Sequence, residues 1–164
     1  MTPPLATARL ILKLAAPEEL RANIESMPPE QRAELSPDWL AKVEAAKSSS
    51  PWIHGFSIIL NKDNEVIGQC GFKGPPSDGA VEIAYGIDPK HQGSGYATEA
   101  AAALTEFAFA DNRVSNVLAH TLPERNASTR VLTKCGFIHV GEVIDPEDGP
   151  AWRWEMTRNA DSIA

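Results

Sequence analysis

Two glycines, Gly93 and Gly95, lie between a strand-like run that ends at Ile87 and an alanine-rich run that follows them. A turn from a strand into a helix leaves unpaired amide N–H groups at the helix start, where the helix dipole also favours negative charge. Glycine lets a phosphate approach the backbone there because no Cβ blocks it. The stretch therefore predicts a site for a phosphate-bearing ligand.

Glu82 is a charged residue in the strand that leads into this glycine turn. By itself, a strand glutamate is more often an exposed residue or an ion-pair partner than a catalytic group, so the residues alone leave its role open. His120, at the end of a later strand, could shuttle a proton, or it could simply be packed or exposed. The other histidines, His54, His91 and His139, show no metal-ligand spacing, so we expect no metal.

Composition narrows the class of protein. The chain has 164 residues and a formal net charge of −7, which argues against a general nucleic-acid binder and against anionic membrane surfaces. No apolar run approaches the length of a membrane span, and the opening Met1 to Pro4 is a poor signal start, so we expect a cytoplasmic protein without membrane contact. Cys70 and Cys135 lie in apolar stretches, where a core position is more common than a nucleophile.

The hydrophobic pattern predicts a single domain over 1–164. Alternation and turn signals predict seven strands, at 8–14, 52–60, 65–72, 80–87, 114–122, 137–144 and 152–157. Helical spacing predicts helices that begin at Pro17 and Pro37 and two more at 95–110 and 126–134, with Pro28 and Pro29 ending the first. In the first strand, Arg9 and Lys13 are expected to face solvent.

Strands at 80–87 and 114–122 are joined by the glycine-loop helix and should therefore be parallel, among antiparallel neighbours. This order predicts an α/β, three-layer fold with a mixed, mostly antiparallel sheet and helices on both faces. The four tryptophans are expected in the core or on sheet faces, although some could line a cleft beside the first two helices. The loop at 145–150 is acidic and could attract a cationic molecule or be a solvated turn.

Three blocks of sequence resemble one known family. The run from Gln92 to Ala97 resembles the Gln/Arg-x-x-Gly-x-Gly/Ala signature of the GNAT superfamily, the acyl-CoA-dependent N-acetyltransferases. The run from Asn126 to Phe137 resembles its second block, Ala-Ser-x-x-Val-Leu-x-Lys-x-Gly-Phe. The run from Thr7 to Leu12 is similar to the first strand of the branch that contains the ribosomal-protein N-terminal acetyltransferases (RimJ/RimL type). The blocks occur in the family's order and cover nearly the whole chain.

The resemblance implies that the phosphate belongs to coenzyme A and that acetyl-CoA is the cosubstrate. It implies that the fourth and fifth strands splay apart, that the pantetheine arm lies in the gap near Ile87, and that the thioester comes beside Glu82 and Tyr85. The cofactor-binding residues it predicts are Ile87, Gln92, Gly93, Ser94, Gly95, Tyr96, Ala97, Asn126 and Ser128.

The resemblance also implies roles in acyl transfer. Glu82 would take the proton of the acceptor ammonium, directly or through water, and an amide near Ile87 would stabilise the oxyanion. Many members protonate the leaving thiolate with a tyrosine five residues before the phenylalanine of the second block, but this chain has Leu132 there. In the ribosomal-protein branch a serine does this, and Ser128 matches it, although Ser128 could instead cap a helix.

Asn126 stands one residue later than the branch usually places its asparagine, so it is either a cofactor contact or a turn residue. With Glu82, Tyr85 and His120 as the predicted acceptor-binding residues, the expected function is transfer of acetyl to a primary amine, on a protein N-terminus or a small molecule, by direct attack in a ternary complex. The expected assembly is a monomer or a homodimer.

Two other classes fit the residues less fully. A catalytically silent acyl-CoA-binding or regulatory domain would have the same glycine loop, but it has no need of Glu82 and Ser128. A Rossmann or P-loop nucleotide-binding protein is disfavoured, because Ser94-Gly95-Tyr96 lacks the P-loop Lys-Ser/Thr and no third dinucleotide glycine follows Gly95.

Overall fold

The structure, a computed structural model, describes residues 4–45, 50–146 and 149–158 and is built on one mixed eight-stranded sheet. Its strands stand in the order β1-β2-β3-β4-β5-β6-β8-β7. Their bounds are β1 (Leu5–Ala6), β2 (Leu10–Leu14), β3 (Phe56–Leu60), β4 (Val66–Phe72), β5 (Ala80–Ile87), β6 (Asn116–Thr121), β7 (Ile138–Asp145) and β8 (Gly149–Thr157).

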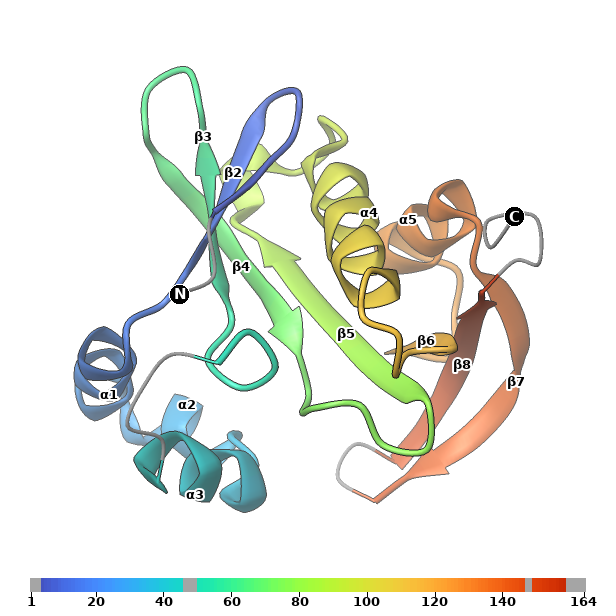
Figure 1. The fold of residues 1–164 in the computed structure, drawn as a ribbon, viewed down its shortest axis with the longest axis horizontal. Helices are drawn as coiled ribbons and strands as arrows, with labels where there is room; N and C mark the ends of the chain where they lie inside the picture. The colour runs from blue at the N-terminus through green and yellow to red at the C-terminus, as the bar shows by residue number, and fades with distance from the viewer. Residues whose placement is uncertain (1–3, 46–49, 147–148, 159–164) are drawn as a thin grey trace.

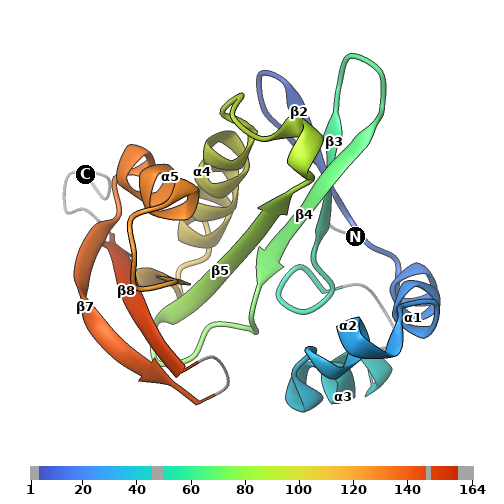
Figure 2. The ribbon, with the colours of Figure 1, turned by 180° about the vertical axis from the view of Figure 1, so that it is seen from behind.

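The helices are α1 (Pro17–Glu25), α2 (Pro29–Ala33), α3 (Pro37–Ala45), α4 (Tyr96–Phe109) and α5 (Ala127–Cys135), with a short 3₁₀ turn at Pro89–His91. Figure 1 shows α4 in front of β5, while Figure 2, from behind, shows β5 in front of α4. In both views α1, α2 and α3 form a separate group near the ends of β3 and β4. No helix in the described ranges is long and apolar enough to cross a membrane.

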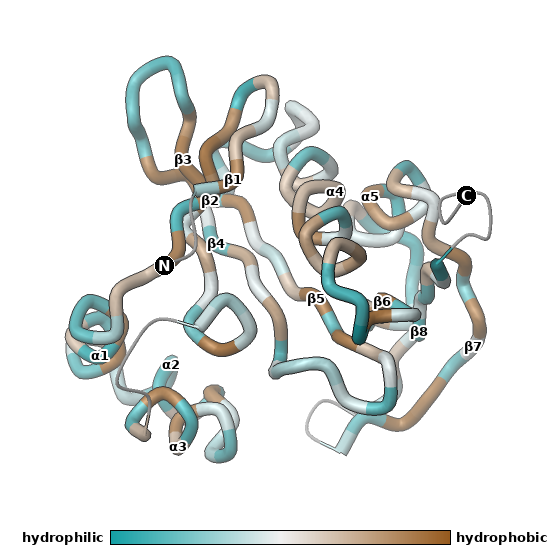
Figure 3. Tube along the Cα trace, in the orientation of Figure 1, coloured by the Kyte–Doolittle hydropathy of each residue, from teal (hydrophilic) through white to brown (hydrophobic). Residues whose placement is uncertain are grey.

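The core lies between α4 and the sheet. Leu10 and Leu12 of β2 are fully buried while Lys13, which follows Leu12, is exposed, as strand alternation requires. From α4, Ala100, Leu104 and other small or apolar residues of one helix face are also buried against the sheet. The hydropathy colours follow this division, because β5 is largely brown and the turn between β3 and β4 is teal (Figure 3).

The predicted parallel pair is present and separates after a short contact. β5 and β6 pair only from Ala80 to Glu82, opposite Asn116 to Leu118. Beyond Glu82, β5 stays paired with β4 as far as Ile87, and β6 stays paired with β8 as far as Thr121. The two strands therefore diverge, and one edge of β5 from Ile83 onward has none of the described strands beside it. Such an edge presents backbone N–H and C=O groups that need other partners.

The predicted fold class is confirmed, with local corrections. The sheet has eight strands rather than seven, because Leu5–Ala6 pairs with β2 before a turn at Arg9. The second predicted strand begins at Phe56, since the segment before it turns back on itself, and Pro29 starts α2 after Pro28 rather than only ending α1. β8 begins at Gly149, within the predicted acidic loop, of which Glu147 and Asp148 lie outside the described residues.

Candidate active site

The glycine loop enters α4 in left-handed backbone conformations. Gly93 has φ +84° and Gly95, directly before α4, has φ +85°, values that residues with a Cβ rarely adopt. A Cβ built on Gly93 would meet nothing within 4 Å, so the backbone is open to an approaching group. The first amides of α4 lie next to this open stretch, which is the arrangement that binds phosphates.

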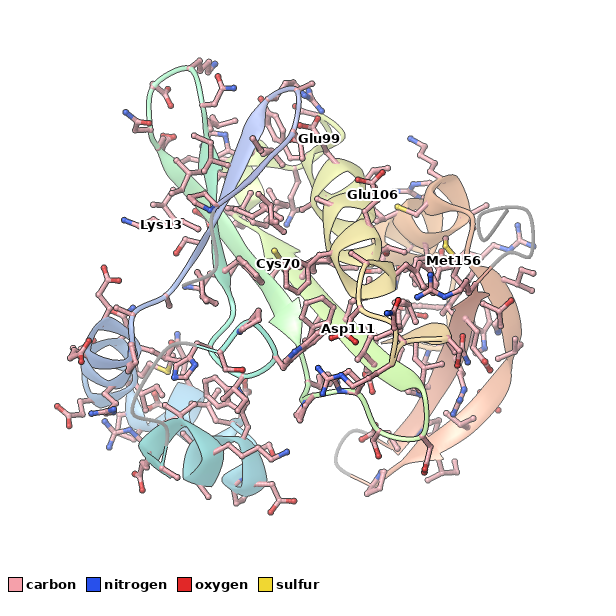
Figure 4. All side chains as sticks on the ribbon, viewed as in Figure 1. Lys13, Cys70, Glu99, Glu106, Asp111 and Met156 are labelled. Carbon is pink, nitrogen blue, oxygen red and sulfur yellow. The ribbon has the colours of Figure 1, made fainter. Side chains whose placement is uncertain are left out.

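Arg9 holds the loop from the other side, while its side chain stays 45% exposed, as predicted. Its Nε lies 2.9 Å from Glu99 Oε1 and its Nη1 donates to the carbonyl of Ser94 at 2.9 Å. Its guanidinium also stacks 4.4 Å from the centre of the Tyr96 ring, and the Thr7 hydroxyl donates to Glu99. In Figure 4, Glu99 lies at the start of α4 beside the turn that carries Arg9. We call Thr7, Arg9 and Glu99 the loop clamp.

The clamp alters the acidity of Glu99. Burial alone would raise the pKa of this carboxyl, but hydrogen bonds from the Thr7 hydroxyl and the Arg9 backbone and side chain outweigh it and lower the pKa. Glu99 therefore stays ionised at neutral pH. It also lies in the first turn of α4.

A pocket of about 410 Å³ opens along the free edge of β5, and most of the predicted cofactor residues line it. Within this coenzyme pocket the Gln92 amide donates to the carbonyl of Ile87 at 2.9 Å, which ties the loop to the end of β5. The pocket is lined by Tyr85, Gly86, Ile87, His91, Gln92, Gly93, Gly95, Tyr96, Ala97, Thr98, Ala127, Ser128, Arg130, Val131 and Lys134.

Two predicted cofactor residues, Ser94 and Asn126, are not among these lining residues. Asn126 is the N-cap of α5: its Oδ1 accepts from the Thr129 amide at 3.0 Å, and Thr129 Oγ1 accepts from the Asn126 amide at the same distance. Ser128 is therefore not the cap. It lies in the first turn of α5 and lines the pocket, so the helix-cap alternative for Ser128 is wrong.

Residues of α5 that sequence reasoning missed also line the pocket. Arg130 and Lys134 stand four residues apart, on one face of the helix, and add two positively charged residues to the pocket that the glycine loop also lines. Their spacing of four residues within a predicted helix was the sequence signal that could have identified them. Leu132 is fully buried in the core.

Tyr85 borders the coenzyme pocket from β5, and its hydroxyl donates to the Ser128 carbonyl at 3.4 Å. Burial raises the pKa of Tyr85 to about 12, with a smaller opposing effect from the bond to Ser128. The phenol is therefore protonated at neutral pH. Tyr85 and Ser128 thus place two hydroxyl-bearing side chains on facing walls of one pocket.

Glu82 and His120 meet where β5 and β6 part. Glu82 pairs with Leu118, and His120 comes two residues later on the same side of β6. Glu82 Oε2 lies 3.0 Å from His120 Nδ1 and 3.0 Å from Lys73 Nζ, and the Glu82 side chain is 21% exposed. No hydrogen bond of good geometry reaches Oε2 or Nδ1 among the described residues, although both atoms are buried. The predicted base and the predicted shuttle are thus brought together.

The remaining predicted candidates occupy other places. Cys70 is buried, which raises its pKa to about 12, and burial also raises the pKa of Cys135, whose thiol donates to the Thr98 carbonyl. His139 stacks on Trp152 and Trp154, and His91 lies 2.8 Å from Glu65. The described residues hold no group of three or more His, Cys, Asp or Glu side chains placed to bind a metal.

Comparison with known proteins agrees with this geometry. The model of the acetyltransferase (GNAT) domain family matches residues 4–138. The chain belongs to the GNAT acetyltransferase family. The N-acetyltransferases p20 of Bacillus licheniformis and YjdG of Bacillus subtilis are 34% and 35% identical to it over 93 and 101 residues. Those segments cover 56% and 60% of this chain and 52% and 57% of the relatives, so the chain spans about half the length of the curated relatives it matches.

Solved structures show the same fold. RimL, a ribosomal α-N-protein acetyltransferase in complex with coenzyme A, has a TM-score of 0.71 at 15% identity, over 97% of this chain and all of that one (100%). An aminoglycoside acetyltransferase in complex with coenzyme A has a TM-score of 0.67 at 23% identity, over 94% of this chain and 98% of that one. At these identities the likeness shows the fold alone.

Proposed function

We propose that this GNAT protein transfers the acetyl group of acetyl-CoA to a primary amine, by direct attack in a ternary complex. The coenzyme pocket carries the proposal, because the free edge of β5, the glycine loop and the start of α5 meet in it. The free edge can pair with the amides of the pantetheine arm as an added strand would. The loop amides and the α4 N-terminus suit the pyrophosphate, and Arg130 and Lys134 suit phosphate oxygens.

In the proposed reaction the amine nitrogen bonds to the acetyl carbonyl carbon while the bond from that carbon to sulfur breaks. An ammonium has no free electron pair, so it must lose a proton before it attacks. The acceptor gives up two protons in all: one ends on the coenzyme A thiol and the other goes to solvent.

Glu82 is the proposed base, with His120 beside it to pass the proton on. Two buried atoms that can each accept a hydrogen bond, Glu82 Oε2 and His120 Nδ1, lie 3.0 Å apart without a well-aligned partner among the described residues. An ammonium N–H placed there would satisfy them. Lys73 adds a positive charge beside the carboxylate.

Ser128 is the proposed proton donor to the leaving thiolate. The finding that Asn126, and not Ser128, caps α5 supports this role. Tyr85 offers a second protonated hydroxyl across the same pocket. The predicted acceptor-binding residues, Glu82, Tyr85 and His120, all border the region where β5 leaves β6. The protein is further proposed to be cytoplasmic, metal-free, without nucleic-acid or membrane partners, and a monomer or homodimer.

The direct test is release of free thiol from acetyl-CoA across a panel of peptides, amino acid amides, polyamines and aminoglycosides. Acetyl-CoA should also raise the melting temperature, whereas ATP and NAD should not. Thermal stabilisation by acetyl-CoA with no thiol release from any acceptor would favour the silent acyl-CoA-binding domain. Equal stabilisation by ATP would remove the coenzyme assignment itself.

A further inference from the structure

A second pocket of about 340 Å³ lies between helices α1 to α3 and strands β3 to β5. Its volume is near the lower end for small-ligand pockets, enough for one bulky side chain with part of its backbone. We call it the helix-side pocket. It is lined by Ala15, Leu20, Asn23, Met27, Leu35, Trp39, Ile53, His54, Gly55, Phe56, Ser57, Gln69, Cys70, Gly71, Phe72, Ala84 and Tyr85.

The lining is largely apolar and aromatic. Leu20 of α1, Trp39 of α3, and Met27 and Leu35 of the turns on either side of α2 are half-buried and line the pocket. The indole N–H of Trp39 already donates to the Ile53 carbonyl at 2.7 Å, so what the ring adds to the pocket is apolar surface. No Asp, Glu, Lys or Arg is among the lining residues that the structure describes, which sets this pocket apart from the surroundings of Glu82.

His54 supplies one buried donor to this apolar site. Its side chain is 3% exposed, and its Nδ1 takes the backbone N–H of Ser50 at 2.9 Å. A ring nitrogen that accepts from an amide carries no proton, so the proton of the ring is on Nε2. Nε2 is buried and has no hydrogen-bond partner within the described ranges. A buried donor without a partner is costly, and it would be satisfied by an oxygen of a bound molecule.

The helix-side pocket joins the coenzyme pocket at Tyr85, which lines both. Ala84 also lines the helix-side pocket. It projects from the same side of β5 as Glu82, which comes two residues earlier in the strand. A molecule seated between the helices and the sheet would therefore present a group to the place where Glu82 and the thioester are proposed to meet.

We propose that the acyl acceptor is the α-amine of an apolar, aromatic amino acid unit, whose side chain fills the helix-side pocket and whose carbonyl oxygen accepts from His54 Nε2. This rests on the proposed function, because it identifies the acceptor of the same reaction. A polyamine or an aminoglycoside has no aromatic or other bulky apolar group to fill the pocket. A free amino acid amide and the first residue of a peptide share the required chemistry.

Binding can be measured separately from turnover, by calorimetry on the protein saturated with coenzyme A. Phenylalaninamide should bind at least about tenfold more tightly than glycinamide, since a buried apolar group separates them. Phenylalaninamide should also bind about tenfold more tightly than 2-phenylethylamine, which lacks the carbonyl oxygen proposed to accept from His54 Nε2. A tetrapeptide that begins with phenylalanine, tested beside phenylalaninamide, distinguishes the peptide source from the free one.

Two variants locate the binding. Ser57→Phe adds a ring to the wall of the helix-side pocket and should weaken the binding of phenylalaninamide at least about tenfold. Ile59→Phe adds the same ring two residues along β3, outside the lining, and should leave its affinity within about twofold. Unchanged melting temperature and coenzyme A affinity would show that both variants fold.

Glycinamide or spermidine binding as tightly as phenylalaninamide would overturn the acceptor assignment, and so would equal effects of the two variants. These results would leave the transferase proposal intact if thiol is released with another amine. Conversely, phenylalaninamide that binds as expected but gives no thiol release, alone or with any other acceptor, would support the pocket and refute the transferase.

Discussion

The coenzyme pocket and the helix-side pocket are built in opposite ways. The coenzyme pocket comes from two short segments, 85–98 and 127–134, and much of its lining is backbone at glycines and at helix starts. The helix-side pocket draws on residues from Ala15 to Tyr85, and its character comes from side chains such as Trp39 and His54. Both meet at Tyr85.

The difference bears on what each region can specify. Backbone amides recognise a phosphate whatever the sequence around them, so a glycine loop can serve many enzymes with one cosubstrate. Side chains from separate helices can change without disturbing that loop, and they decide which acceptor fits. The first predictions below test whether the two pockets are as independent as they look.

Gly95→Trp should give the largest effect, the loss of measurable acetyl-CoA binding. Gly95 has φ +85°, and a Cβ there would lie 3.2 Å from the Arg9 guanidinium, so an indole would collide with the loop clamp. Calorimetry with acetyl-CoA measures the loss. Phenylalaninamide binding should survive if the pockets are independent, and its disappearance in a variant with an unchanged melting temperature would show that they are not.

Glu82→Gln should lower kcat by about 10²- to 10⁴-fold, the usual contribution of a general base, while acetyl-CoA affinity stays unchanged. The matched control is Glu106→Gln, an exposed carboxyl on α4, which should leave kcat within about twofold. The deficit should shrink as pH rises and more acceptor is already deprotonated. A full kcat in Glu82→Gln at neutral pH would contradict the base role.

The sequence predicted the coenzyme side far better than the acceptor side. The glycine loop, the parallel pair and α5 depend on local rules, such as glycine at positive φ, a strand followed by a helix, and a helix cap at Asn126. The splay of β5 and β6 was predicted only from the family resemblance, and the short pairing of Ala80 to Glu82 agrees with it.

Three features escaped because they depend on contacts between distant segments. The exposure of Arg9 was predicted but its contacts were not, since nothing near it in sequence indicates Glu99 ninety residues away. The free Nε2 of His54 follows from a turn at Ser50 that strand alternation does not predict. The placement of β8 between β6 and β7 also depends on the whole sheet.

The loop clamp should couple the first strands to coenzyme binding. Arg9→Ala removes the contacts to Glu99 and to the Ser94 carbonyl, and we expect acetyl-CoA affinity to fall about tenfold, with phenylalaninamide affinity unchanged. Lys13→Ala, at an exposed charge on β2, the strand that follows Arg9, is the control. Equal acetyl-CoA affinity in both variants would show that the loop holds its shape without the clamp.

The clamp also predicts a pH dependence. The pKa of Glu99 is lower in the folded chain than its ordinary value of 4.5, so its contribution to stability is complete above that value. The contribution should be lost as pH falls below about 4.5 and through the lower folded pKa, because the clamp then has to bind a protonated carboxyl. Urea unfolding from pH 7 to pH 3 should show a smaller loss of stability in Glu99→Gln than in the wild type.

The smallest effect is expected at Cys135, at the end of α5, which is not among the residues that line the coenzyme pocket. Direct attack needs no acyl-enzyme, and burial raises the pKa of this thiol, so little thiolate is present at neutral pH. Cys135→Ala should therefore keep kcat within about twofold. Mass spectrometry of the wild type with acetyl-CoA alone should show no acetylated protein. An acetylated Cys135 that disappears when acceptor is added would replace direct attack with a two-step transfer, and the two pockets would then act in turn rather than together.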